Sequence, residues 1–366
     1  MSLRIQLVEE ENEKLKINNY SIPKKKSETL EYISFSKIIS SYGVIVLHIN
    51  GFWKFRSNNI RQFRILNLYE SVFYFSVPVF VLCIGATLLN FNEKYSLIEY
   101  NKRRFFKVII PLLGWNIILY YYKAYYLKSI KKEKFSFVNL WNYFFLSKVN
   151  HIFDSLHLFL LSYMIIPLIA YVEKSNKMKI YIYYFFFLLI TQAIIPYIFK
   201  VFDFRLVWIY KLKLGYTIYV LAGYIINNYK FALYQKKIVY SLGFFSFLIH
   251  FFGTEYCYFI NRKNIRLHKG YLNVPSIIYS CSLFLLIKEK SYIIYKRYKN
   301  IINKIGSLTF GPFFLHNPLN DIFLSYPILY KYISYNTFLH GLCIFLISLI
   351  ISKILKQIPI LKLLVP

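Results

Sequence analysis

Long apolar runs constrain this chain more than any other feature of its sequence. Stretches of about 20 mostly apolar residues recur between residues 33 and 354, and a helix needs about 20 such residues to cross the hydrocarbon core of a bilayer. Lipid offers the backbone no hydrogen-bonding partner, so segments of this kind must satisfy their own backbone groups as helices. The pattern therefore predicts an all-α fold, a polytopic transmembrane helical bundle.

We predict about ten spans, separated by short basic and polar blocks. Their ranges are about 33–52, 68–90, 107–126, 156–173, 179–199, 214–229, 237–253, 271–288, 307–324 and 334–354. The ninth span contains Pro312 and Pro318, and we expect these to break it because proline removes a backbone donor inside a helix. Residues 1–32 then form an N-terminal tail, residues 33–355 one transmembrane domain and residues 356–366 a C-terminal tail.

The strong positive charge of the chain follows the same organisation. The formal net charge is +30, which in a soluble protein would suggest nucleic acid as the partner. Here the Lys and Arg residues stand in short blocks between the apolar runs, as is typical of segments that flank spans and contact anionic lipids. We therefore predict membrane lipids as partners, and no nucleic acid. The four cysteines have no metal-binding spacing, so no metal site is expected.

The opening segment, MSLRIQLVEEENEKLKINNYSIPKKK, is polar and lacks the apolar core of a signal peptide. We expect it in the cytoplasm, and an even number of spans places the C-terminus on the same side. The excess of Lys and Arg on that side is small once the N-terminal region is left out, so charge supports this orientation only weakly. The predicted location is the cell membrane, crossed several times.

The first apolar run, FSKIISSYGVIVLHINGFWKF at residues 35–55, carries Lys37 and His48. Ionisable groups at membrane depth are costly, and each is a functional hypothesis by default. The two residues are eleven positions apart, which on a helix is about 20° past three full turns, so both lie on one face about 16 Å apart. This arrangement suits a long ligand with an anionic head at Lys37 and a reactive end at His48. The alternative is a lysine that reaches the interface and a histidine bonded to a neighbouring helix.

Two further segments carry a recognisable pattern. In VPVFVLCIGATLLNFNEK, residues 77–94, Gly85 interrupts an apolar run and lets another helix approach closely. The segment NKRRFFKVIIPLLGW, residues 101–115, opens with a basic cluster. Arg104 and Lys107 lie on one helix face, and basic side chains at the start of a helix suit a phosphate group. Ordinary charge flanking a span is the alternative.

These segments, in this order, resemble the membrane-bound acyltransferase family 3. Its members have a basic residue, ten intervening residues and a His in the first span, then a VPxFF…SG span and a kRxxRxxxP start to the third span. Later, YVLAGYIINN at 219–228 is similar to the family's FllGYyl segment, and LTFGPFFLHNP at 308–318 to its SfgiYLiHp span. The resemblance covers about residues 33–355.

The chain departs from the family pattern at three places. The basic residue of the first span is Lys37, where Arg is commoner, and Ile84 stands where Ser usually precedes the glycine. The HLWFL signature of the fourth span is reduced to HLFL at His157–Leu160. These departures bear on the fine shape of the pocket.

The resemblance implies an acyltransferase that moves an acyl group, most often acetyl, from cytoplasmic acyl-CoA to a hydroxyl of a cell-envelope or exported glycan, which is often lipid-linked. Acetyl-CoA is then the donor, and no metal is required. It further implies that the phosphates of CoA are held by Lys37, Arg103, Arg104 and Lys107. His48 is the implied catalytic residue, either as general base for the attacking hydroxyl or as an acyl-histidine.

Other residues and functions stay open. His316, between two prolines of the ninth span, is a candidate for binding the acceptor or the carbonyl oxygen, or else a histidine bonded in helix packing. Glu70 and Asp321 lie near span ends, where we expect the lipid interface rather than a role in orienting a histidine. The alternative function is a membrane carrier for a glycan, lipid or solute, which would show paired interrupted spans in two halves. A scaffold would need no intramembrane charge.

Overall fold

The computed structural model describes residues 31–54, 59–127, 138, 152–203, 214–261, 267–326 and 336–366. The structure is 84% helical, and no strand occurs in the described residues. The all-α prediction is therefore confirmed. Almost all of the predicted N-terminal tail lies outside the described ranges.

The described helices follow the predicted apolar runs along the chain. They are α2 (Glu31–Ile49), α3 (Ile60–Phe73), α4 (Ser76–Leu88), α5 (Leu97–Arg104), α6 (Ile110–Tyr121), α8 (Ile152–Ala170), α9 (Lys177–Leu188), α10 (Ile195–Val201), α11 (Thr217–Asn228), α12 (Leu233–Leu248), α13 (Thr254–Tyr256), α14 (Val274–Gly306), α15 (Phe310–Ser325) and α17 (Thr337–Gln357). Short 3₁₀ turns are η1 (Phe52–Lys54), η2 (Phe91–Glu93) and η10 (Leu361–Leu364). Wider π-helical turns, which join or extend the α-helices, are η3 (Phe105–Ile109), η4 (Tyr122–Tyr126), η6 (Leu189–Ile194), η8 (Ile249–Gly253) and η9 (Cys257–Asn261).

Six helical stretches among the described residues are long and apolar enough to cross a membrane. They are Glu31–Ile49, Ile60–Glu93, Leu97–Tyr126, Lys177–Val201, Leu233–Ile260 and Thr337–Gln357. The predicted count of about ten is not confirmed. α11 has 12 residues and α15 has 16, fewer than the roughly 20 that a perpendicular span needs.

The prolines of the ninth predicted span do not break it, contrary to expectation. α15 runs without interruption through Pro318, and Pro312 lies in its first turn, where a backbone donor has no partner to lose. The Tyr122 hydroxyl donates to the Pro318 carbonyl oxygen over 3.4 Å. A side chain from a neighbouring helical segment thus contacts α15 beside this proline.

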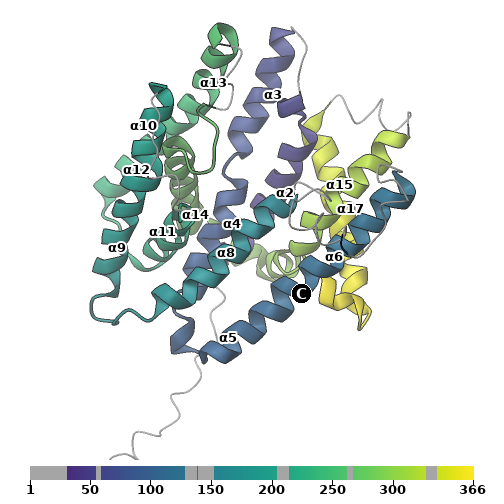
Figure 1. The fold of residues 1–366 in the computed structure, drawn as a ribbon, viewed down its shortest axis with the longest axis horizontal. Helices are drawn as coiled ribbons and strands as arrows, with labels where there is room; N and C mark the ends of the chain where they lie inside the picture. Colours follow the sequence, from purple (N-terminus) through teal and green to yellow (C-terminus); the bar gives the residue numbers. More distant parts are fainter. Residues whose placement is uncertain are drawn as a thin grey trace, which may run out of the picture.

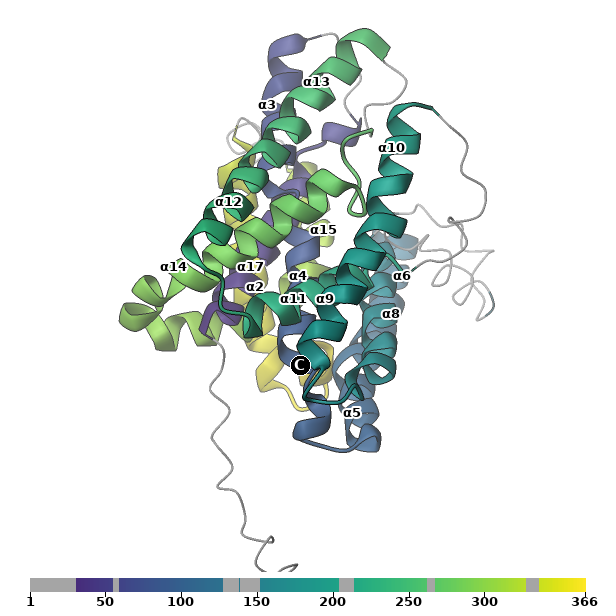
Figure 2. The same ribbon diagram turned by 90° about the vertical axis from the view of Figure 1, so that its left-hand side faces the viewer.

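Two glycines set the closest helix crossing in the core. A Cβ atom at Gly85 of α4 would collide with the Val220 carbonyl oxygen of α11, and one at Gly223 of α11 would collide with the Leu82 carbonyl oxygen of α4. Each helix therefore places a glycine against the backbone of the other. The expectation that Gly85 admits a neighbouring helix is confirmed, and α2 and α4 lie inside the bundle (Figures 1 and 2).

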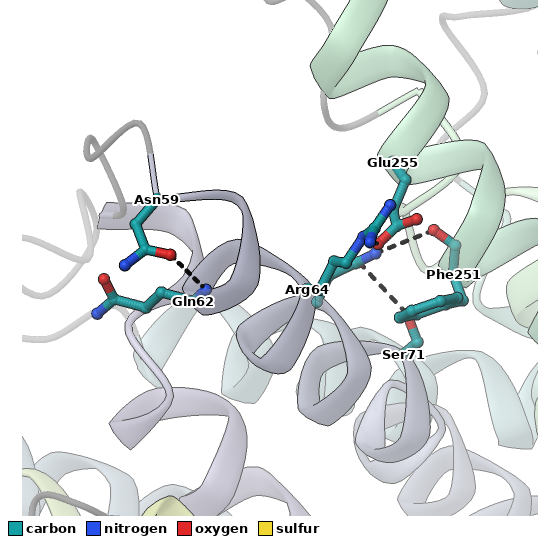
Figure 3. A network of polar contacts seen from close by, with 7 residues as sticks. Asn59, Gln62, Arg64, Ser71, Phe251 and Glu255 are labelled. Atoms are coloured by element: carbon teal, nitrogen blue, oxygen red, sulfur yellow. Dashed lines mark hydrogen bonds and ion pairs between the residues drawn. The ribbon is translucent and has the colours of Figure 1, made fainter.

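The two ends of the molecule are formed by different elements. α5 lies at one end, and the start of α3 lies beside α13 at the other (Figures 1 and 2). At this second end Arg64 of α3 forms an ion pair with Glu255 of α13, with Nε and Oε1 3.1 Å apart (Figure 3). Asn59 caps the start of α3 by accepting a hydrogen bond from the Gln62 backbone (Figure 3).

The segment after α17 turns back into the bundle. The Trp115 indole of α6 donates to the Leu364 carbonyl oxygen over 2.9 Å, and Val365 is only 1% exposed. Residues of the predicted C-terminal tail therefore belong to the core and reach the site described next.

Candidate active site

A cavity of about 540 Å³ opens near the α5 end of the bundle. Its wall contains four basic side chains, Lys37, Arg104, Lys107 and Lys356, and none of the described residues that line it has an acidic side chain. Apolar residues of α4, α8 and α15 complete the described wall. The cavity therefore concentrates basic side chains inside a helical bundle, which favours an anionic ligand.

Arg104 is the most firmly held of these cations. Its guanidinium lies 5.7 Å from the centre of the Tyr100 ring and 5.4 Å from that of Tyr163. The Tyr100 hydroxyl in turn donates to the Tyr163 carbonyl oxygen over 2.8 Å. Aromatic faces hold a cation without using its hydrogen-bond donors, and Nε of Arg104 is buried with no hydrogen-bond partner in the described part of the chain. Arg104 thus lies at the cavity wall, held by the two tyrosine rings.

Lys356 is a site residue that the sequence reasoning missed. It lies in the last turn of α17, and its ammonium donates to the Ser307 carbonyl oxygen at the end of α14 over 2.8 Å. No motif marks it, and it falls where the sequence predicted the start of a tail. Only the packing of α17 near the start of α15 brings it to the cavity.

Arg103 does not join the cavity, contrary to expectation. Its side chain is exposed, pairs with Glu99 over 2.7 Å and covers the Tyr95 ring at 4.7 Å. Successive helix residues point about 100° apart, so when Arg104 faces inward its neighbour must face elsewhere. The predicted pairing of Arg104 with Lys107 on one face is consistent with the structure, because both line the cavity.

His48 lies in the last turn of α2, away from the cavity wall. Its side chain is exposed, and its ring centre is 4.9 Å from that of His316 in α15. The two histidines come from positions far apart in the chain. The structure thus brings together the predicted catalytic residue and the tentative substrate-binding residue.

The protonation of His316 follows from its contacts. The residue is fully buried, and its Nδ1 lies 2.9 Å from the Pro312 carbonyl oxygen. A carbonyl oxygen only accepts, so Nδ1 carries the hydrogen and Nε2 of the neutral ring is the acceptor. That Nε2 is buried and has no hydrogen-bond partner among the described residues. His316 therefore presents an acceptor nitrogen close to His48.

One aromatic side chain connects the cavity to the histidine pair. Phe313 lines the cavity, and its ring centre is 6.5 Å from that of His316. The basic cavity and the histidine pair are thus connected through the side chain of Phe313.

Two secondary predictions have different outcomes. Glu70 is buried, at 2% exposure, rather than at a lipid interface, because the turn after α2 folds over it. Asp321 is half-buried and interacts electrostatically with Lys123.

The structure describes the helix that contains His157 but not the side chain of His157. No group of three or more metal-ligating side chains occurs in the described residues.

A comparison with protein families identifies the chain. A family model described as an acyltransferase domain matches residues 30–356, which include both histidines and all four cavity cations. The comparisons with curated proteins and with solved structures returned no match. The family match covers nearly the whole chain, and the apolar helices agree with it. This protein belongs to the acyltransferase family 3 and is a membrane acyltransferase.

Proposed function

We propose that this protein transfers an acyl group, with acetyl as the first candidate, from acyl-CoA to a hydroxyl of a cell-envelope or exported glycan. The observation that carries the proposal is the cavity, whose described lining contains four basic side chains and no acidic one. The proposal includes a location in the cell membrane, with both termini and the cavity facing the cytoplasm, where acyl-CoA is found.

Coenzyme A fits the charge and the shape of this site. It is a phosphorylated nucleotide with a long thin arm that ends in the thioester. Arg104 can bind a phosphate through two parallel hydrogen bonds, while the lysines act as point charges. A cavity of about 540 Å³ falls within the range of about 300–1,000 Å³ that small-molecule sites occupy. The arm would then extend past Phe313 toward the histidine pair.

The histidine pair supports the chemistry of transfer. The acceptor hydroxyl oxygen attacks the thioester carbonyl carbon while its proton passes to His48. The carbon–sulfur bond then breaks, and CoA leaves as the thiol after its sulfur takes the proton from His48. General-base help of this kind contributes about 10²–10⁴-fold to the rate. His316, with Nδ1 bound to a carbonyl, can accept a hydrogen bond from His48 or from the acceptor hydroxyl. An acyl-histidine at His48 is the alternative role of the same residue.

A labelling experiment tests this function. Membranes with the wild-type protein, His48→Ala or His340→Ala are given acetyl-CoA labelled in the acetyl group, and label is followed into the glycan fraction. We expect labelling with the wild type, none with His48→Ala, and labelling in proportion to protein level with His340→Ala, because His340 lies outside the pair and the cavity. Equal labelling with His48→Ala would overturn the catalytic role, and no labelling in any sample would overturn the proposed donor.

A further inference from the structure

Two buried charges lie beyond the histidine pair, and the transfer step makes no use of them. Glu70 of α3 is 2% exposed and Lys269, in the segment before α14, is 3% exposed. Burial of an ionisable group costs free energy because its charged form loses its hydration. Ionisable groups at such positions are more often kept for function.

The carboxylate of Glu70 holds the turn that follows His48. Its Oε1 accepts a hydrogen bond from the Trp53 indole over 2.8 Å, and its Oε2 accepts one from the Asn50 amide over 3.3 Å. The Asn50 amide also donates to the Leu66 carbonyl oxygen of α3 over 2.8 Å. Both donors therefore lie within five residues of His48, and both are tied to α3.

The backbone of this turn needs such support. Gly51 adopts a φ of +69°, a left-handed conformation in which the chain reverses after the end of α2 and leaves the helix. The Asn50 backbone still donates to the Val46 carbonyl oxygen over 2.8 Å, and the 3₁₀ turn η1 follows at Phe52. The contacts of Glu70 connect this turn to α3.

Lys269 holds the same turn from its other side. Its ammonium lies 4.4 Å from the centre of the Phe52 ring, and it donates to the side-chain oxygen of Asn67 and, over 3.4 Å, to the Asn67 carbonyl oxygen. Asn67 in turn donates to the Phe251 carbonyl oxygen over 2.9 Å, on the face of α3 that Figure 3 shows. The turn is thus fixed between α3 and the segment around Lys269.

We propose that Glu70 and Lys269 are positioning residues, which fix the turn at residues 50–54 and so hold His48 against His316. This inference rests on the proposed function. The catalytic residue is at the end of a helix, where the backbone is least constrained, and the contacts of Glu70 and Lys269 with the following turn supply the constraint. Displacement of a catalytic group by about 1 Å can cost about 100-fold in rate.

Kinetics of Glu70 variants give the first test. In Glu70→Gln the amide can accept only one of the two hydrogen bonds. We expect kcat to fall about 10- to 100-fold. The KM for acetyl-CoA should change less than about twofold, because the cavity with the four basic side chains lies at the other end of α2. Glu70→Asp, which keeps the charge, should recover part of kcat. Unchanged kcat in Glu70→Gln, or a loss explained by the amount of folded protein, would overturn the inference.

A second readout does not depend on acyl transfer. His48 is exposed, so its modification by diethyl pyrocarbonate can be followed by mass spectrometry of the purified protein. We expect Glu70→Gln to change the rate constant at His48 at least twofold. The matched control is Glu289→Gln, a carboxylate paired with Lys236 elsewhere in the bundle, which should leave the rate unchanged. If the wild type transfers no acetyl group, the proposed function fails, and this measurement still decides the inference: an unchanged rate at His48 in Glu70→Gln overturns it.

Discussion

Arg103 and Arg104 are neighbours in the chain, yet they have different surroundings. Arg104 lies between two tyrosine rings at the cavity wall, whereas Arg103 pairs with Glu99 on the exposed side of α5. The same charge therefore has two uses, and the direction in which each side chain leaves the helix decides between them. At the residue scale, substitution of each arginine in turn therefore tests whether a cavity position or an exposed position binds the donor.

Arg104→Ala should raise the KM for acetyl-CoA, whereas Arg103→Ala should leave it within about twofold. A hydrogen bond to a charged group contributes about 1.5–3 kcal/mol, so we expect an increase of roughly tenfold to a hundredfold for Arg104→Ala. Initial rates at varied acetyl-CoA concentration measure the effect. Equal changes in both variants, or a change confined to the acceptor kinetics, would show that the cavity does not bind the phosphates.

At the scale of elements, the crossing of α4 and α11 decides where the cavity can form. Gly85 and Gly223 allow the two backbones to touch. Residues of α4 on either side of Gly85 line the cavity, namely Phe80, Cys83, Ile84, Thr87 and Leu88. A wider crossing would move this wall away from Lys37. The glycines thus act on the site through the distance between helices rather than through any contact with the ligand.

Gly85→Ala should destabilise the protein more than Gly114→Ala. The new Cβ atom at position 85 meets the backbone of Val220, which cannot move away without shifting α11, whereas at position 114 it meets a terminal methyl group of Leu364. Overpacking of this kind costs about 1–3 kcal/mol. Thermal unfolding of both variants in detergent measures the difference. Equal unfolding midpoints in the two variants would show that α4 and α11 can move apart without loss of stability.

At the scale of the whole molecule, the cavity joins segments from the first and the last of the described α-helices. α2 contributes Lys37, α5 contributes Arg104, and α17 contributes Lys356. A ligand that neutralises these charges connects segments that otherwise repel one another. Binding should therefore stabilise the entire fold and not only the loops around the site.

Coenzyme A alone should raise the stability of the protein. At a concentration of 100 times its Kd, a ligand that binds only the folded state adds about 2.7 kcal/mol. Thermal unfolding in detergent at rising CoA concentration measures this effect. Lys356→Ala should require more CoA for the same shift, and Lys353→Ala, an exposed position on the same helix, should not. A shift that is identical in both variants would remove Lys356 from the binding site.

The apolar runs and the spacing of a few residues were sufficient to predict the class of fold and part of the site. A chain with runs of about 20 apolar residues has to form helices in lipid. Residues three or four apart on a helix share a face whatever surrounds them, so Arg104 and Lys107 could be placed together from their spacing alone. The family followed from motifs that lie within single segments.

Contacts between distant segments were decided by the tertiary structure alone. The pairing of His48 with His316, the presence of Lys356 in the cavity and the burial of Glu70 each depend on how one helix or turn packs against another. Spacing along the chain determines direction only within one helix. The arrangement of helices is determined by close packing, here by glycines that let backbones touch, and no short stretch of sequence contains both sides of such a contact.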